Sequence, residues 1–177
     1  MTLSRAPLPS PEAVMATGQG LLAETMPRYD AINAGALTSG SAYFTAIPLY
    51  AGTSIAQLIV QVTAAAAGLT LCKLGIYSKT LALLAATADQ SALFNGATQV
   101  VAAPLAAPFV VPSSDLYYAV ILTVGVTPPT VQRSSGLNQW NVGAGARAYG
   151  VETALADLPA QAALSAGAGQ AIWVGCA

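Results

Sequence analysis

The sequence predicts an all-β fold, a jelly-roll-like antiparallel β-sandwich of about eight to ten short strands with an extended N-terminal arm. Short runs in which apolar residues alternate with small or polar ones recur along the chain, and Gly, Pro, Asn, Ser or Asp closes each run. Such turn residues return about every eight to twelve residues, which is the strand spacing of a sandwich. No repeat of about 20 to 50 residues accompanies them, so a solenoid or propeller is not indicated.

The chain of 177 residues is long enough for one hydrophobic core of ordinary size. We expect an N-terminal arm over residues 1–40 and the sandwich domain over residues 41–177. Pro7, Pro9 and Pro11 alternate with other residues, and proline favours extended backbone both at its own position and at the preceding residue. Glycines and a later proline limit the rest of the arm to short helical turns.

The arm contains more apolar side chains than a solvated tail needs, and charged residues gather around a tyrosine near its end. We therefore expect it to become ordered on a neighbouring subunit, with a disordered tail as the alternative. The assembly interface predicted in this way consists of Leu8, Val14, Met15, Leu21, Leu22, Glu24, Met26, Arg28 and Tyr29.

After the arm, alternating residues predict strands over 41–50 and 55–63, with a turn between them. The alanine run at residues 64–67, followed by Gly68, is interpreted as a loop to the next strand rather than a helical turn. Further strands are expected over residues 69–77, 81–87, 98–103 and 106–111. Pro104 and Pro108 separate the last two, because proline cannot donate to a β-ladder.

The best-patterned strand spans residues 115–124. One face carries Leu116, Tyr118, Val120 and Leu122, and the other carries Tyr117, Ala119, Ile121 and Thr123. This pattern predicts a strand that is buried on one side and half-covered on the other. Strands over residues 146–153 and 171–177 complete the expected sandwich.

The charge content is unusually low, because charged residues make up only 7% of the chain against roughly 25% in a typical soluble domain. A surface this poor in charge suits large buried interfaces, so we expect a homo-oligomer, a trimer or another symmetric assembly. The six lysines and arginines are scattered and the net charge is -1. Nucleic acid is therefore not an expected partner, since no basic stripe is present to neutralise phosphates.

Catalytic chemistry is nearly absent from the sequence. It contains no histidine, which removes the commonest general base and the commonest metal ligand. Asp89, Asp115 and Asp157 stand beside breaks and are expected to cap turns, with a shared calcium site as the alternative. Cys72 and Cys176 are interpreted as small buried side chains on strands, with a disulfide as the alternative. We predict no enzyme, no cofactor and no metal.

The mean hydropathy of +0.60 raises the question of a membrane span. The most apolar window, residues 55–71, is interrupted by Gln57, Gln61 and Gly68 and has no basic flank. The N-terminus carries prolines where a signal peptide has its apolar core. Neither membrane insertion nor a signal peptide is expected.

One polar loop stands out as a second candidate site. Asn138, Trp140 and Asn141 combine an aromatic face with amides, a combination that binds sugars, so they are candidate ligand contacts. Burial of Trp140 at the end of the sandwich is the favoured interpretation, and ligand contact is the alternative. The glycines at residues 143–150 lack the spacing and the strand-to-helix context of a nucleotide-binding loop.

Several segments carry a family resemblance: LLAETMPRYDAI, GTSIAQLIVQVT, LTLCKLGIYS, LALLAATADQSALF, PFVVPSSDLYYAVILTV and DLPA. Together they resemble the β-sandwich domain of tailed-bacteriophage virion surface proteins, which include minor tail, fibre-like and capsid decoration proteins. The resemblance covers about residues 21–160 and provides no catalytic residue.

This resemblance implies a structural protein on the surface of a phage particle, made in the host cytoplasm and attached through its arm as a minor tail or fibre-like protein. Its implied partners are copies of itself and other virion proteins of the capsid or tail. A capsid decoration protein that stabilises the shell is one alternative. A module that binds a host cell-wall glycan or receptor through the Trp140 loop is the other.

Overall fold

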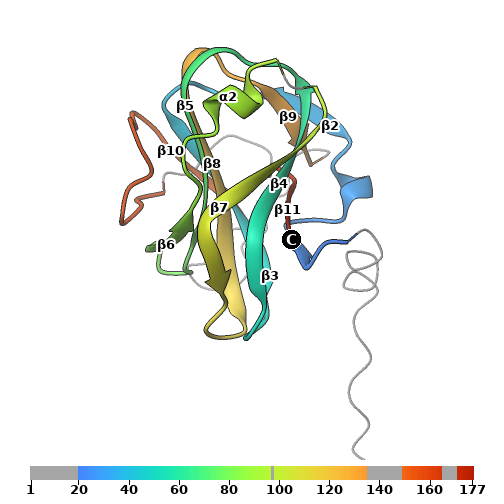
Figure 1. Ribbon diagram of the computed structural model, residues 1–177, viewed down its shortest axis with the longest axis vertical. Helices are drawn as coiled ribbons and strands as arrows, with labels where there is room; N and C mark the ends of the chain where they lie inside the picture. The colour runs from blue at the N-terminus through green and yellow to red at the C-terminus, as the bar shows by residue number, and fades with distance from the viewer. Residues whose placement is uncertain (1–19, 97, 135–148, 165–170) are drawn as a thin grey trace, which may run out of the picture.

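The computed structural model describes residues 20–96, 98–134, 149–164 and 171–177. Within these ranges, eleven strands form two antiparallel sheets that pack face to face (Figure 1). The only other regular elements described are two single turns, the 3-10 turn η1 (Arg28–Asp30) and the helical turn α2 (Ser91–Phe94). The predicted all-β antiparallel sandwich is therefore confirmed.

The first sheet is built around one long strand, β4 (Ser54–Ala64). Along one edge of β4 runs β7 (Val100–Val110), and the other edge pairs first with β11 (Val174–Cys176) and then with β9 (Thr130–Arg133). Two short strands close the sheet: β1 (Ala23–Glu24) pairs with β11, and β2 (Asn33–Ala36) pairs with β9.

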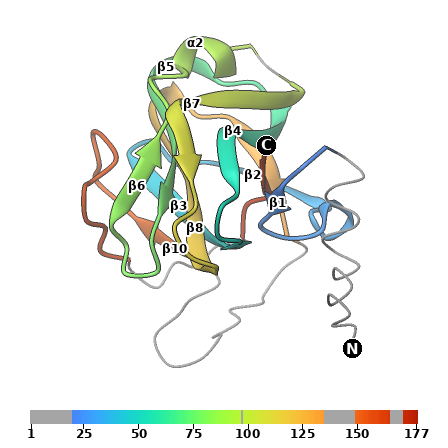
Figure 2. The ribbon, with the colours of Figure 1, turned by 60° about the horizontal axis from the view of Figure 1, so that its bottom comes forward.

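The second sheet has the order β10-β3-β8-β5-β6 and is centred on β8 (Asp115–Thr127). Its other strands are β3 (Ser41–Leu49), β5 (Ala67–Tyr77), β6 (Leu83–Ala86) and β10 (Tyr149–Glu152). The two sheets meet along one side, where Leu105 of β7 pairs with Thr87 just after β6. Figure 2 shows β6 and β7 side by side there.

The prediction of two strands around Pro104 and Pro108 is wrong, because β7 is one strand from Val100 to Val110. Gln57 of β4 pairs with Pro104 of β7, and Ile55 pairs with Phe109. Between these two pairs β7 has more residues than β4, so β7 bulges away from its partner. A bulge leaves residues without ladder partners, so the missing N–H groups of the two prolines cost little there. A connection without helix after β4 is confirmed, but it is shorter than the predicted loop over residues 64–67, since β4 ends at Ala64 and β5 begins at Ala67.

The strand β8 is buried on both faces, whereas the sequence predicted one half-covered face. Its inner residues Tyr117, Ala119 and Ile121 lie in the main core between the sheets, together with both cysteines. Its outer residues Tyr118, Val120 and Leu122 form a second core with Phe44 and Tyr77. Residues 153–164, which we call the covering segment, close this outer face through Leu158 and Ala162. The second sheet therefore has apolar cover on each side.

Cys72 and Cys176 are both buried free thiols, on β5 and β11, which confirms the interpretation as small core side chains. Burial raises the pKa of the Cys176 thiol to about 12, and burial together with Asp89 raises that of Cys72. No helix among the described residues is long and apolar enough to cross a membrane.

Two threonines on inner faces of the second sheet differ in their hydrogen bonding. Thr45 is buried, and its Oγ1 accepts the N–H of Ile172 at 3.1 Å, which joins the two sheets. Thr123 is fully buried, and its Oγ1 has no hydrogen-bond partner. A buried hydroxyl without a partner destabilises the folded state, whereas a paired one contributes to stability.

We predict opposite effects for the same substitution at these two sites. Thr123→Val should raise the free energy of unfolding by roughly 1 kcal/mol, because it replaces an unpaired hydroxyl with a methyl group of similar size. Thr45→Val should lower it by about 1 to 3 kcal/mol, because it leaves the Ile172 N–H unpaired. Urea denaturation of the two variants measures both values, and a loss of stability in Thr123→Val would contradict the assignment.

Candidate interaction surfaces

Residues 20–32, which we call the N-terminal segment, cover the part of the outer face of the first sheet around Trp173 and Ile59. Trp173 points outward beside β11 and forms a small buried cluster with Leu21 and Ala31. Met26 and Ile59 pack against this cluster. Gly175 makes the contact possible, since a Cβ at this position would lie 3.0 Å from Cδ2 of Leu21.

Polar contacts hold the N-terminal segment over Trp173. The indole Nε1–H donates to Glu24 Oε2 at 3.0 Å, and the guanidinium carbon of Arg28 lies 5.4 Å from the centre of the indole ring. Arg28 also donates to Gln61 Oε1 on β4 at 2.8 Å. The tryptophan is therefore bound at its edge by a carboxylate and at its face by a cation.

The same segment completes the edge of β11. The N–H groups of Leu22 and Thr25 donate to the carbonyls of Cys176 and Val174 at 2.8 and 2.9 Å. The Thr25 hydroxyl continues the ladder, since its Oγ1 accepts the Val174 N–H at 3.0 Å and donates to the Ile172 carbonyl at 2.9 Å. These bonds leave β11 with a paired edge, which an exposed strand would lack.

These contacts correct the predicted boundary of the arm. Residues 1–19 lie outside the described residues, but residues 20–40 include β1 and β2 and belong to the sandwich rather than to a separate arm over residues 1–40. Pairing across about 150 residues of sequence decides this, and local patterns do not report such pairing.

The predicted interface residues therefore divide into three groups. Leu21, Glu24, Met26 and Arg28 make contacts within the chain around Trp173. Leu22 and Tyr29 are exposed, and the neighbouring Ile32, which the sequence reasoning missed, is exposed as well. Leu8, Val14 and Met15 lie outside the described residues. So do the candidate ligand contacts Asn138, Trp140 and Asn141, which stay a hypothesis.

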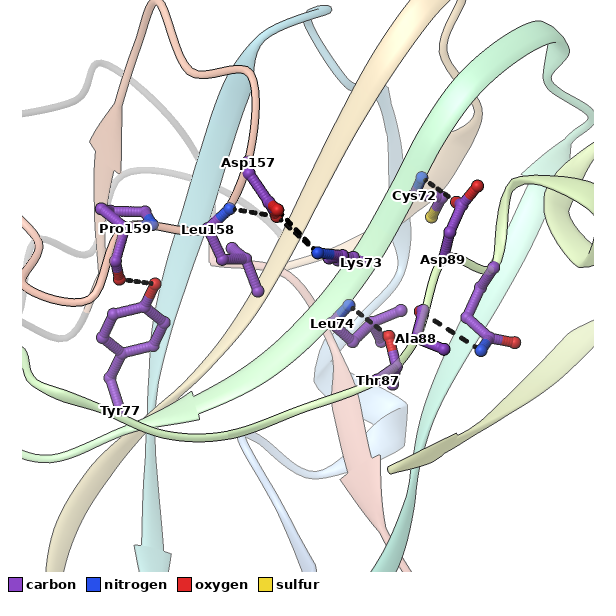
Figure 3. Close-up of polar contacts among 11 residues, drawn as sticks. Cys72, Lys73, Leu74, Tyr77, Thr87, Ala88, Asp89, Asp157, Leu158 and Pro159 are labelled. Carbon is purple, nitrogen blue, oxygen red and sulfur yellow. Dashed lines mark hydrogen bonds and ion pairs between the residues drawn. The ribbon is translucent and has the colours of Figure 1, made fainter. Parts of the chain in front are cut away.

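The covering segment on the second sheet is held by a second set of polar contacts (Figure 3). Lys73 Nζ donates to both carboxylate oxygens of Asp157, at 2.7 and 2.8 Å. The Asp157 carboxylate also accepts the Leu158 N–H, and the Tyr77 hydroxyl donates to the Pro159 carbonyl at 2.7 Å. The hydrogen bond from Lys73 is the main reason that the pKa of Asp157 lies below its ordinary value.

The predicted turn-capping role is confirmed for all three aspartates. Asp89 accepts the N–H of Cys72 at 2.8 Å (Figure 3). It also accepts both the N–H and the hydroxyl of Ser91. Asp115 and Asp157 each accept the N–H of the following residue. Burial raises the pKa of Asp89, but its hydrogen bonds outweigh burial and lower the pKa overall. Asp115 also pairs with Lys79, which lowers its pKa.

The acidic side chains thus act mainly as structural acceptors. In the described part of the chain, five of the six acids accept hydrogen bonds from other groups: Glu24, Asp89, Asp115, Glu152 and Asp157. No group of three or more Cys, Asp or Glu side chains that could hold a metal ion occurs among the described residues. Several of these carboxylates hold one segment of the chain against another, as Glu24 does at Trp173 and Asp157 at Lys73.

Comparison with known proteins gives no match, either to a protein-family model or to a curated protein.

Adjacent leucines test the role of the N-terminal segment. Leu21→Ala should lower the free energy of unfolding by about 2 to 3 kcal/mol, because it opens a cavity beside Trp173. Leu22→Ala is the matched control and should change it by less than about 0.5 kcal/mol, because Leu22 is exposed. Urea denaturation gives both values. Equal effects of the two substitutions would mean that the segment is not docked as described.

The aspartates predict a loss of stability in acid. Their pKa values are lower in the folded state than in the unfolded chain, so their contribution is complete above the unfolded value of about 3.9 and disappears as the pH falls through the folded values. The urea concentration at the unfolding midpoint should therefore decrease when the pH is lowered from 6 to 3. Asp157→Asn should reduce this fall, and Lys73→Met should do the same, because it removes the partner that lowers the Asp157 pKa. An unchanged fall in both variants would contradict the assignment.

Proposed function

We propose that the protein is a non-enzymatic structural protein of a bacteriophage virion, a minor tail or fibre-like surface protein that attaches through its N-terminal residues and displays the sandwich. The observation that carries the proposal is where the resembling segments lie. GTSIAQLIVQVT, LTLCKLGIYS and DLYYAVILTV make up most of β4, β5 and β8, the long strands at the centre of the two sheets. The resemblance therefore falls on the packing framework.

The position of residue 20 supports attachment through residues 1–19. The Leu22 N–H donates to the Cys176 carbonyl, and the carbonyl of Ala177 accepts the N–H groups of Ala56 and Gln57. The first described residues therefore lie beside β11, the last strand. Nineteen residues span at most about 60 Å when extended, which is enough to reach a neighbouring protein. Leu8, Val14 and Met15 supply apolar side chains for such a contact.

The low charge of the chain supports a role within a large assembly. Several charged side chains of the described residues hold segments of the same chain, as Lys73 and Asp157 do, and Arg28 with Glu24 around Trp173. A surface with few free charges is weakly protected against association, and in a particle this property becomes useful.

Particle composition tests the proposal. A phage that lacks the gene is complemented with the wild-type chain or with a variant, and purified particles are analysed by quantitative mass spectrometry. We expect the wild-type chain in the particles and at least tenfold less of the triple variant Leu8→Ser, Val14→Ser, Met15→Ser. Each apolar side chain that is buried against the particle should contribute about 1 kcal/mol or more to the free energy of binding.

The matched control is Val110→Ser, a change at an exposed position of the sandwich, which should enter particles normally. Circular dichroism confirms that each variant is folded. Absence of the wild-type chain from particles would overturn the virion assignment. Normal incorporation of the folded triple variant would overturn attachment through residues 1–19.

A further inference from the structure

Among the described residues, one end of the sandwich carries no charged side chain. It comprises residues 62–70, 91–96, 98–100 and 124–131, and we call it the uncharged end. The charged residues of the described chain all lie elsewhere: Glu24, Arg28, Asp30, Lys73, Lys79, Asp89, Asp115, Arg133, Glu152 and Asp157. Two charged residues are the nearest in sequence: Asp89, two residues before α2, and Arg133, two residues after Val131. The Asp89 carboxylate is bound by Cys72 and Ser91, and the Arg133 guanidinium donates to the Ala36 carbonyl.

The parts of the uncharged end form one continuous surface, with the turn between β4 and β5 in the middle. On one side, Ala66 pairs with Asn95 at the end of α2, and its carbonyl accepts the Gly96 N–H. On the other side, Gly68 lies against Val126, since a Cβ at this position would come 3.4 Å from Val126 Cγ2. Figure 1 shows α2 at this end and the β7–β8 turn at the opposite end.

Large apolar side chains on this surface face solvent. Val126 is 87% exposed, and Leu93 and Val100 are each 45% exposed. Alanines and threonines fill much of the remaining surface, including Ala64, Ala67 and Thr127. The core of a protein interface has this composition, because charged residues are depleted there.

Some of the polar groups of the uncharged end are paired within the chain. Asn95 Oδ1 accepts the Leu69 N–H at 3.2 Å. The hydroxyls of Thr63 and Thr70 donate to the carbonyls of Thr130 and Val124. Removing these paired groups from water would leave their hydrogen bonds intact, which keeps the cost of burying them small.

We propose that the uncharged end is a self-association surface on which a second copy of the chain docks. A surface without charge can meet its own copy about a symmetry axis without repulsion between like charges, which a charged patch cannot do. With this end buried, the ion pairs Lys73–Asp157 and Lys79–Asp115 remain on the parts of the molecule that face water. The inference rests on the proposed function, because it names the surface through which the virion protein would assemble.

Sedimentation equilibrium of the full-length chain tests the proposal. We expect wild-type protein to self-associate in a concentration-dependent way. Val126→Asp should raise the dissociation constant at least tenfold, because docking would bury an unpaired carboxylate. Val110→Asp is the matched control, since Val110 is 60% exposed at the β7–β8 end near the Lys79–Asp115 pair, and it should associate like wild type. Leu93→Asp should behave like Val126→Asp.

Circular dichroism and the urea midpoint verify folding, and Leu93→Asp provides a second readout if Val126→Asp is unfolded. A wild-type chain that is monomeric at about 100 μM would overturn the proposal, because this concentration is well above a micromolar dissociation constant. So would equal association of Val126→Asp and Val110→Asp. If the wild-type chain is monomeric but Val126→Asp fails to enter particles, another virion protein occupies this end, and self-association is again overturned. Particle composition, measured separately, decides the virion assignment whatever the outcome here.

Discussion

The constraint on which this structure depends is that apolar side chains occupy both faces of its sheets. An ordinary sandwich buries one face of each sheet and exposes the other, but β8 carries Tyr117 and Ile121 inward and Tyr118 and Leu122 outward, and all four are buried. The first sheet meets the same constraint through Trp173, which points away from the main core. Each outer face must therefore be covered by a further segment of the chain. The N-terminal segment and the covering segment provide these layers.

This constraint explains how the scarce charges are used. The covering segment is held by Asp157 and Lys73, and the N-terminal segment by Glu24 and Arg28 at the two sides of an indole. In both places a charged side chain holds a segment in position, and apolar side chains of the same segment cover the outer face of a sheet. The surface that remains contains few free charges, and one end of the sandwich contains none among the described residues.

The position of Asp89 beside a polar break was sufficient to predict its turn-capping role, which depends on a neighbour two residues away. The alternation of residues predicted the fold class and the strands β3, β4, β5 and β8, because in a sheet the side-chain period follows directly from the backbone. It did not predict that residues 20–40 join the sandwich, because β1 contributes only two residues and its partner β11 lies at the other end of the chain. Proline caused a further error at β7, where a bulge makes its missing N–H inexpensive.

The candidate surfaces were harder to predict for the same reason. Leu21 and Leu22 have the same side chain and stand side by side in the sequence, yet one is buried against Trp173 and the other faces water. The uncharged end is formed by three turns that are about 20 to 60 residues apart in the sequence, so it cannot be recognised in any single stretch. Leu8, Val14 and Met15 remain predictions from composition, as does the loop around Trp140.

We propose that the molecule is a structural unit whose uncharged end meets copies of itself on a phage particle. Electron cryomicroscopy of the intact particle tests this most directly, because it reveals both the location and the contacts of each sandwich. We expect sandwiches clustered about symmetry axes, with α2 and Val126 of each copy at the contact. Sandwiches that stand apart, that meet through the β7–β8 end, or that are missing from the particle would contradict it.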